Sequence, residues 1–132
     1  MTDSTQLPKD QEPTTRVLAM PTDTNAGDDI FGGWIMSQVD IAASVAAYRR
    51  AHGKVVTVAV NEFQFHQPVF VGDLISCYAE VVHVGNTSLS VHVEVYAERD
   101  RGEIECIKVT KANLTFVAIG KDGKPRTVPP EP

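Results

Sequence analysis

The 132-residue chain is long enough for one domain that buries roughly two thirds of the surface its unfolded form exposes, so neither a metal ion nor a disulfide is required for folding. Its hydrophobic fraction of 42% and charged fraction of 22% are ordinary for a globular protein and exclude a fibrous or fully disordered chain. The net charge of -5 argues against general nucleic-acid binding, although a local basic patch remains compatible with an anionic ligand.

Residues 1–14 are polar, contain prolines and show no hydrophobic periodicity, which predicts a disordered arm that contributes nothing to a core. The chain begins with neither a basic flank before an apolar segment nor an amphipathic Arg-rich segment, so a cytoplasmic protein is expected. Order is expected to begin near Thr15, where a short apolar run to Met20 is typical of a strand and is closed by Pro21. Residues 22–29 are rich in turn-forming and helix-capping residues and predict a loop.

The stretch from Ile30 to Ala47 is nearly apolar, and Asp40 is its only charged residue. The pair Gly32-Gly33 near its beginning leaves bare backbone N–H groups at a helix start. The helix is expected to end near His52-Gly53, where basic residues suit the negative end of the helix dipole. Polar residues within it favour a helix buried in protein over a membrane span, so no membrane insertion is expected and Asp40 is expected to be buried.

After residue 53 the hydrophobic period changes to two, which predicts strands at residues 55–65, 74–84, 88–98 and 104–119. Turn-forming residues separate these runs, and short connections between sequential strands favour antiparallel pairing. Together with the first short strand they predict an α+β domain, in which a five-stranded antiparallel sheet curls around one long helix. A sheet of this size leaves strand edges uncovered, so a homo-oligomer is expected.

Metal and thiol chemistry find no support in the sequence. Cys77 and Cys106 fit no metal-ligand spacing and lie in strand-like runs, where a free thiol packs as a small hydrophobic group. The four histidines are scattered without ligand spacing, and His66, which precedes the turn at Pro68, is the strongest exception to a purely structural interpretation. The sequence also lacks the G-x-S-x-G pattern of serine hydrolases and the glycine-rich fingerprints of phosphate and dinucleotide sites.

Asp40 stands seven residues after Gly33, which is roughly 10 Å along a helix. A carbonyl polarised by the N–H groups of the helix start and a base acting at the same carbonyl must both lie within about 3 Å of neighbouring reacting atoms. One helix cannot easily meet both conditions, but two copies side by side can, with the start of one helix facing Asp40 of the other. We therefore hypothesise a site shared across a dimer. The alternative is that Asp40 is a structural acid.

Four segments carry a family resemblance: NAGDDIFGGWIMSQVDIAA, VVTVAVNEFQFHQPVFVGD, GNTSLSVHVEV and FVAIGKDGKPRTVP. Together they resemble the hotdog-fold acyl-CoA thioesterases, specifically the YciA-type bacterial enzymes related to cytosolic acyl-CoA hydrolases. The resemblance covers residues 16–129. It implies a hotdog domain over residues 15–120, followed by a C-terminal tail over residues 121–132. It further implies hotdog dimers that assemble into a homohexamer, with acyl-CoA substrate and coenzyme A as partners and no cofactor.

The resemblance also implies roles for individual residues. Asp40 matches the catalytic carboxylate, which acts on a water or directly on the thioester carbonyl, and the N–H of Gly33 faces the thioester oxygen. Asn25 and Asp29 match loop positions that line the acyl-thioester site, and they are expected to take part in catalysis. Gly32, directly before Gly33, is expected to bind substrate. Further positions are expected to contact pantetheine and the nucleotide phosphates: Thr87, Ser88, Lys121, Lys124 and Arg126. The chain departs from the family pattern at Gly27-Asp28, where relatives usually carry Asn-Gly.

The expected function is hydrolysis of acyl-CoA to a free carboxylic acid and coenzyme A. Two alternatives use the same scaffold. A non-catalytic acyl-CoA-binding or sensing module has no need for a carboxylate in the position of Asp40. A dehydratase acting on hydroxyacyl thioesters needs a histidine near the site, and neither the helix nor its preceding loop contains one.

Overall fold

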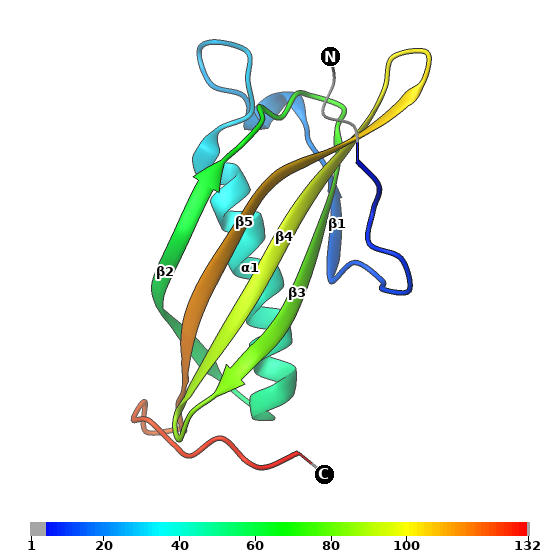
Figure 1. Cartoon of the computed structure of the whole chain (residues 1–132). Helices are drawn as coiled ribbons and strands as arrows, with labels where there is room; N and C mark the ends of the chain where they lie inside the picture. Colours follow the sequence, from blue (N-terminus) through cyan, green and yellow to red (C-terminus); the bar gives the residue numbers. More distant parts are fainter. Residues whose placement is uncertain (1–4, 132) are drawn as a thin grey trace.

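A single long helix lies across one face of an antiparallel sheet, as Figure 1 shows for the computed structural model, which describes residues 5–131. The elements in chain order are β1 (Thr15–Leu18), the short 3-10 helix η1 (Pro21–Asp23), α1 (Gly32–Ala51), β2 (Val55–Phe65), β3 (Leu74–Val84), β4 (Ser88–Asp100) and β5 (Ile104–Ala118). The five strands are ordered β1-β3-β4-β5-β2, so β1 and β2 form the two edges of the sheet. The predicted α+β class and the five antiparallel strands are confirmed.

Helix α1 begins after Phe31 and ends at His52, which adopts a left-handed conformation with φ 55° and donates its N–H to the carbonyl of Tyr48. The left-handed residue at the helix end is thus His52, which directly precedes Gly53, the glycine predicted to end the helix. Arg49 and Arg50 occupy the last turn, where their charges suit the negative end of the helix dipole. Among the described residues, no helix combines the length and the apolar character that a membrane span needs.

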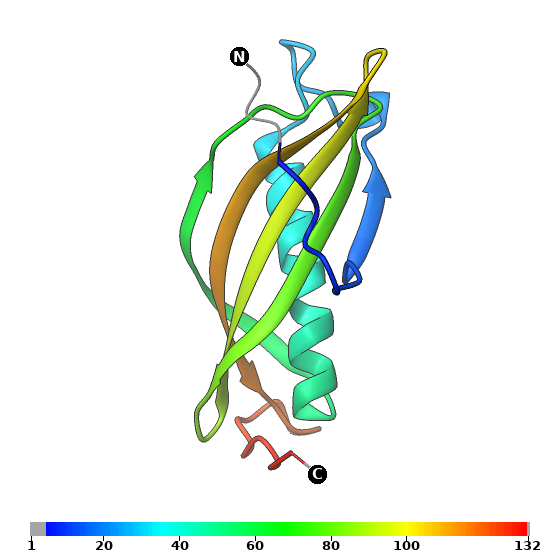
Figure 2. The same ribbon diagram turned by 45° about the vertical axis from the view of Figure 1, so that its right-hand side comes forward.

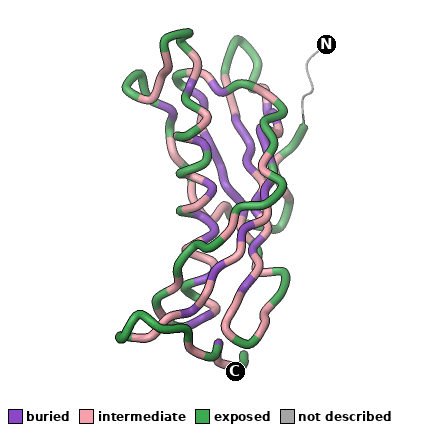
Figure 3. The backbone as a smooth tube through the Cα atoms, turned by 90° about the vertical axis from the view of Figure 1, so that its left-hand side faces the viewer, coloured by how far each residue is buried: buried purple, intermediate pink, exposed green. Residues whose placement is uncertain are grey.

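The core forms between α1 and the concave face of the sheet, where the buried positions of both elements meet (Figure 3). The helix contributes small residues there, because Ala42, Ala43 and Ala47 are fully buried. Small side chains let the helix axis approach the valines and aromatic rings of β4 and β5 closely. The thiols of Cys77 and Cys106 are free and buried, and burial raises the pKa of Cys77 to about 11.

The opposite side of the helix stays uncovered in a single chain. Its exposed apolar side chains include Met36, Ile41 and Tyr48, and the neighbouring edge strand β2 exposes three valines and Phe65. Asp40 lies at the boundary between the covered and uncovered sides and is only partly buried. A single sheet thus leaves part of the helix uncovered, as expected, and the predicted burial of Asp40 is only partial in one chain because the sheet covers one side of the helix.

The part of the N-terminal arm that the structure describes lies against the sheet. Figure 2 shows this segment crossing the outer face of the strands. The N–H of Thr5 donates to the carbonyl of Cys106 at 2.7 Å, and Leu7 packs against Tyr78 and Tyr96. The expectation that the arm contributes nothing to a core is thus wrong for residues 5–14. The domain boundary at residue 15 stays a prediction, and residues 1–4 lie outside the described part.

Candidate active site

The start of α1 presents backbone N–H groups toward open space. The N–H groups of Trp34 and Ile35 both donate to the carbonyl of Phe31, whereas a helix leaves the preceding N–H groups, here those of Gly32 and Gly33, without an intrahelical acceptor. A Cβ atom on Gly33 would meet nothing within 4 Å, but one on Gly32 would lie 3.0 Å from the ring of Phe65. Gly32 therefore accommodates a packed ring, while Gly33 is open to a ligand at the positive end of the helix dipole.

The loop before the helix is organised by Asn25. The side-chain oxygen of Asn25 accepts the N–H of Gly27 at 2.8 Å and the N–H of Asp29 at 3.2 Å. The backbone N–H of Asn25 donates to the carbonyl of Asp29 at 2.7 Å. Within this tight turn Asp28 has a φ of 66°, a region that glycine enters without the strain an L side chain adds. Asn25 thus shapes the approach to the helix start through its side-chain oxygen.

An open pocket of about 340 Å³ lies at this end of the helix. Asn25, Asp29 and Gly32 line one side of it, and residues 65–69 line the other. The pocket thus brings together three of the predicted site residues, and Gly33 follows directly in the chain. It also includes His66, which the sequence singled out among the histidines only because of its place before Pro68.

Asp40 lies outside that pocket and has a different partner. The hydroxyl of Thr57 on β2 donates to the Asp40 carboxylate, with 2.7 Å between the two oxygens. This bond holds the carboxylate at the uncovered edge where α1 meets β2. Sequence reasoning missed Thr57, because nothing in a strand pattern says which of its residues meets a helix 17 positions earlier.

The residues predicted to contact pantetheine and phosphates lie at the opposite end of the molecule. Figure 1 places the β3–β4 turn, which carries Thr87 and Ser88, beside the C-terminal tail and away from the helix start. The guanidinium of Arg126 donates to the carbonyl of Ala51 at 2.8 Å and to that of Ile119 at 3.1 Å. One donor thus caps the last residue of the helix and another binds the chain just after β5, which gives Arg126 a structural role.

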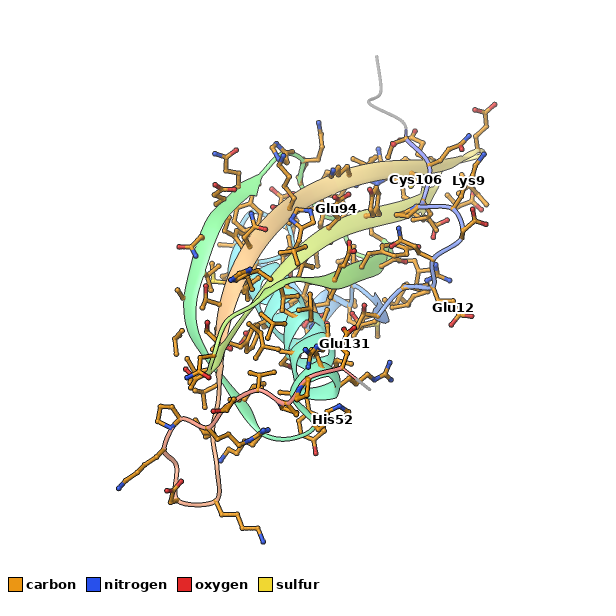
Figure 4. The ribbon with its side chains drawn as sticks, turned by 60° about the horizontal axis from the view of Figure 1, so that its bottom comes forward. Lys9, Glu12, His52, Glu94, Cys106 and Glu131 are labelled. Carbon is orange, nitrogen blue, oxygen red and sulfur yellow. The ribbon has the colours of Figure 1, made fainter. Side chains whose placement is uncertain are left out.

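A second pocket, of about 380 Å³, lies beside this helix end and is lined in part by His52, Lys54, Lys121 and Arg126. Figure 4 shows His52 at this end of the helix, near the C-terminal segment. Lys54 stands close to Arg49 and Arg50 in the sequence but was not chosen as a site residue, whereas the fold brings it to the same pocket as Lys121. Lys124 is exposed in the turn that follows.

One chain does not bring the predicted residues at the helix start together with those at the helix end. The helix rises about 27 Å between Gly33 and Ala51, with Asp40 part-way along it. Among the described residues, no cluster of three or more His, Cys, Asp or Glu side chains has an arrangement that could hold a metal ion.

The strained turn before the helix yields a testable expectation. We expect Asp28→Gly to raise the free energy of unfolding by about 0.5 to 1 kcal/mol, since glycine adopts a φ of 66° without the Cβ penalty. Thermal unfolding measures this gain, with Asp23→Gly in η1 as a control that lacks the positive φ. A lower melting temperature for Asp28→Gly would show that the Asp28 side chain makes a stabilising contact that outweighs the strain.

Comparison with known proteins places this site in a family. The family model described as the Thioesterase superfamily matches residues 27–104, which include the glycine pair, Asp40 and Thr57. The chain belongs to the thioesterase superfamily. The acyl-CoA thioester hydrolase YciA of Escherichia coli is 48% identical over 118 residues, which are 88% of this chain and 89% of that protein.

Two further relatives agree with this assignment. An uncharacterized acyl-CoA thioester hydrolase of Haemophilus influenzae is 49% identical over 120 residues, covering 88% of this chain and 77% of that protein. The crystal structure of a hexameric hotdog-fold thioesterase of Campylobacter jejuni superposes with a TM-score of 0.87 and 48% identity, covering 90% of this chain and 91% of that chain. The family resemblance and the hotdog fold of this thioesterase-superfamily member are therefore confirmed.

Proposed function

We propose that this protein hydrolyses acyl-CoA thioesters to a free carboxylic acid and coenzyme A. The observation that carries the proposal is the carboxylate of Asp40, which accepts the hydroxyl of Thr57 on β2 at 2.7 Å. Asp40 stands on the same helix as Gly33, whose N–H has no intrahelical acceptor and beside which there is open space. The names of the relatives support the substrate class, since both curated proteins cited above are called acyl-CoA thioester hydrolases. A cytoplasmic location is part of the same proposal.

The chemistry follows from two groups, the N–H of Gly33 and the carboxylate of Asp40. The N–H of Gly33, together with the helix dipole, stabilises the negative charge that develops on the thioester oxygen, an effect typically worth about 10²-fold or more in rate. Asp40 either removes a proton from the attacking water or attacks the carbonyl carbon directly. The carbon–sulfur bond then breaks, and the sulfur of coenzyme A gains a proton, from protonated Asp40 in the first route and from solvent in the second. In the second route water then hydrolyses the acyl–Asp40 anhydride, which releases the carboxylic acid and restores the carboxylate.

We propose further that each site forms between two chains. Asp40 and Gly33 of one chain are separated by about 10 Å of helix, which is too far for both to act on one carbonyl. The exposed apolar side of α1 and the long edge strand β2 offer a surface on which a second copy can pack. Two antiparallel helices packed there place the start of one beside the middle of the other. The hexameric state of the Campylobacter jejuni relative supports a homohexamer built from such pairs.

Within this pair, the basic pocket at the helix end is the proposed site for the phosphates of coenzyme A. Lys121 and Lys54 line it together, and an acidic protein needs such a local cluster to hold a polyanion. Thr87 and Ser88 lie at the same end of the molecule, where they are proposed to contact the pantetheine arm. Arg126 contributes by anchoring the tail that carries Lys121.

A thiol-release assay with acetyl-, butyryl- and palmitoyl-CoA tests the proposal. Release of free coenzyme A from at least one substrate, with the carboxylic acid detected by mass spectrometry, supports it. Binding without turnover would instead support the sensing module. Because His66 lines the pocket at the helix start, 3-hydroxybutyryl-CoA is included, and formation of an enoyl product there would favour the dehydratase.

Thr57 provides a narrower expectation. We expect Thr57→Val, which keeps the shape of the side chain but removes the donor, to lower kcat by about tenfold or more, because hydrogen bonds to charged groups are worth about 1.5 to 3 kcal/mol. Thr57→Ser retains the hydroxyl and is the matched control, with kcat expected near that of the wild type. An unchanged kcat for Thr57→Val would mean that the bond serves only the fold.

A further inference from the structure

A buried ion pair lies away from Asp40 and takes no part in the chemistry described so far. Asp73 and Arg99 are joined by two bonds, one of 2.8 Å from Nη2 and one of 3.2 Å from Nε of the arginine. The side chain of Asp73 is 3% exposed and that of Arg99 is 10% exposed. Burying two charges costs desolvation energy, so such a pair is weak evidence for a gain in stability and raises the question of what else it does.

The pair fixes the loop between β2 and β3. The second carboxylate oxygen of Asp73 also accepts the N–H of Phe70 at 2.9 Å, and Arg99 donates to the carbonyl of Pro68 at 3.2 Å. The guanidinium of Arg99 lies over the ring of Phe70, with its central carbon 4.7 Å from the ring centre. The loop is thus held through the backbone of Pro68 and Phe70 and through the ring of Phe70.

This loop is one wall of the pocket at the helix start. Pro68 and Val69 line that pocket together with Gly32, and Val69 is 1% exposed. The carbonyl of Val69 accepts the N–H of Ile30 at 3.0 Å, and Ile30 stands two residues before the first turn of α1. The ion pair thus holds both chain neighbours of Val69, and Val69 in turn bonds the backbone that leads into Gly33.

We propose that Asp73 and Arg99 are positioning residues of the thioesterase site, which set the distance between the loop wall and the N–H groups of the helix start. The inference rests on the proposed function. A loosened loop shifts Ile30 and widens the pocket, and a displacement of about 1 Å at a reacting group can cost on the order of 10²-fold in rate. The effect is expected in kcat and in the relative rates with different acyl chains, since Pro68 and Val69 of this loop are among the apolar residues that line the pocket.

The test uses Arg99→Lys in the full chain, because lysine keeps the charge beside Asp73 but lacks the planar fork that reaches both the carboxylate and the Pro68 carbonyl. At a temperature well below its melting point, we expect kcat with butyryl-CoA to fall at least about tenfold and the acetyl-to-palmitoyl rate ratio to change, while inhibition by free coenzyme A stays the same. The amide of Ile30 is expected to exchange hydrogen faster than in the wild type, as measured by NMR. The matched control is Arg16→Lys, which removes the hydrogen bond from Arg16 Nε to Ser76 elsewhere in the sheet and should move none of these readouts.

A double variant keeps the proposal testable if Arg99→Lys does not fold. Asp73→Asn combined with Arg99→Gln replaces the ion pair by neutral groups that still form hydrogen bonds, and avoids leaving one buried charge unpaired. Its kcat and acyl-chain profile are expected to change in the same direction. Wild-type kcat, chain profile and Ile30 exchange in a folded variant would overturn the inference. Absence of thiol release from the wild type would instead overturn the proposed function, so the two failures are distinct.

Discussion

Replacing Asp40 with asparagine is expected to lower kcat for thioester hydrolysis by about 10²- to 10⁴-fold, the range typical of a positioned acid–base group. The amide has nearly the shape of the carboxylate, and its oxygen can still accept the hydroxyl of Thr57, so the fold is expected to persist. What the variant loses is the negative charge that activates water or attacks the carbonyl. Thiol release under saturating substrate measures kcat, and the melting temperature reports whether the fold is intact.

The matched control is Asp29→Asn, which makes the same chemical change in the other acid predicted for the site. Asp29 lines the pocket, and it bonds Asn25 through its backbone N–H and carbonyl, so its amide variant is expected to keep kcat within about tenfold of the wild type. Equal activity of Asp40→Asn and wild type would return Asp40 to the role of a structural acid. Tight acyl-CoA binding with no turnover in the wild type would favour the sensing module.

Most of the fold could be predicted from the sequence because periodicity determines it locally. The change from a helical to a two-residue period at Gly53 marked the end of α1, and the predicted run of residues 55–65 matches β2 (Val55–Phe65). Strand β4 runs two residues beyond its predicted end at residue 98, to Asp100. That extension carries Arg99. Because a charged residue is typical of a turn, the strand was predicted to end before it, although its side chain is only 10% exposed.

The site was harder to predict because its contacts join segments far apart in the chain. Gly33 and Asp40 carry local signals, a helix start and an isolated charge, whereas Asn25 was predicted only through the family resemblance. Thr57 carries no such signal, since register and strand order decide which side chains meet. The roles of the site residues, including the phosphate contacts at Lys121 and Lys124, stay predictions until variants are measured.

The helix α1 has more apolar surface than one sheet can cover. An apolar helix with exposed Met36, Ile41 and Tyr48 is consistent with burial only if another molecule covers its second side. The partial exposure of Asp40 in one chain is what the proposed site between two chains requires.

Gly33→Pro tests whether the N–H at position 33 takes part in the reaction. Proline removes the N–H at position 33, and its ring is tolerated in the first turn of a helix. We expect kcat to fall about 10²-fold or more through loss of this one donor. Gly33→Ala is the matched control, since it keeps the N–H and its Cβ meets nothing within 4 Å, so its kcat is expected to stay near that of the wild type.

Co-expression of Gly33→Pro with Asp40→Asn, under two different affinity tags, then decides whether a site spans two chains. In a mixed pair, the helix start of the Asp40→Asn chain faces the intact Asp40 of the Gly33→Pro chain, so one of the two sites is complete. Random pairing makes half of the dimers mixed, and activity should recover to about one quarter of the wild-type value. A site contained within one chain predicts no recovery at all, because every chain then carries one defect in its own site.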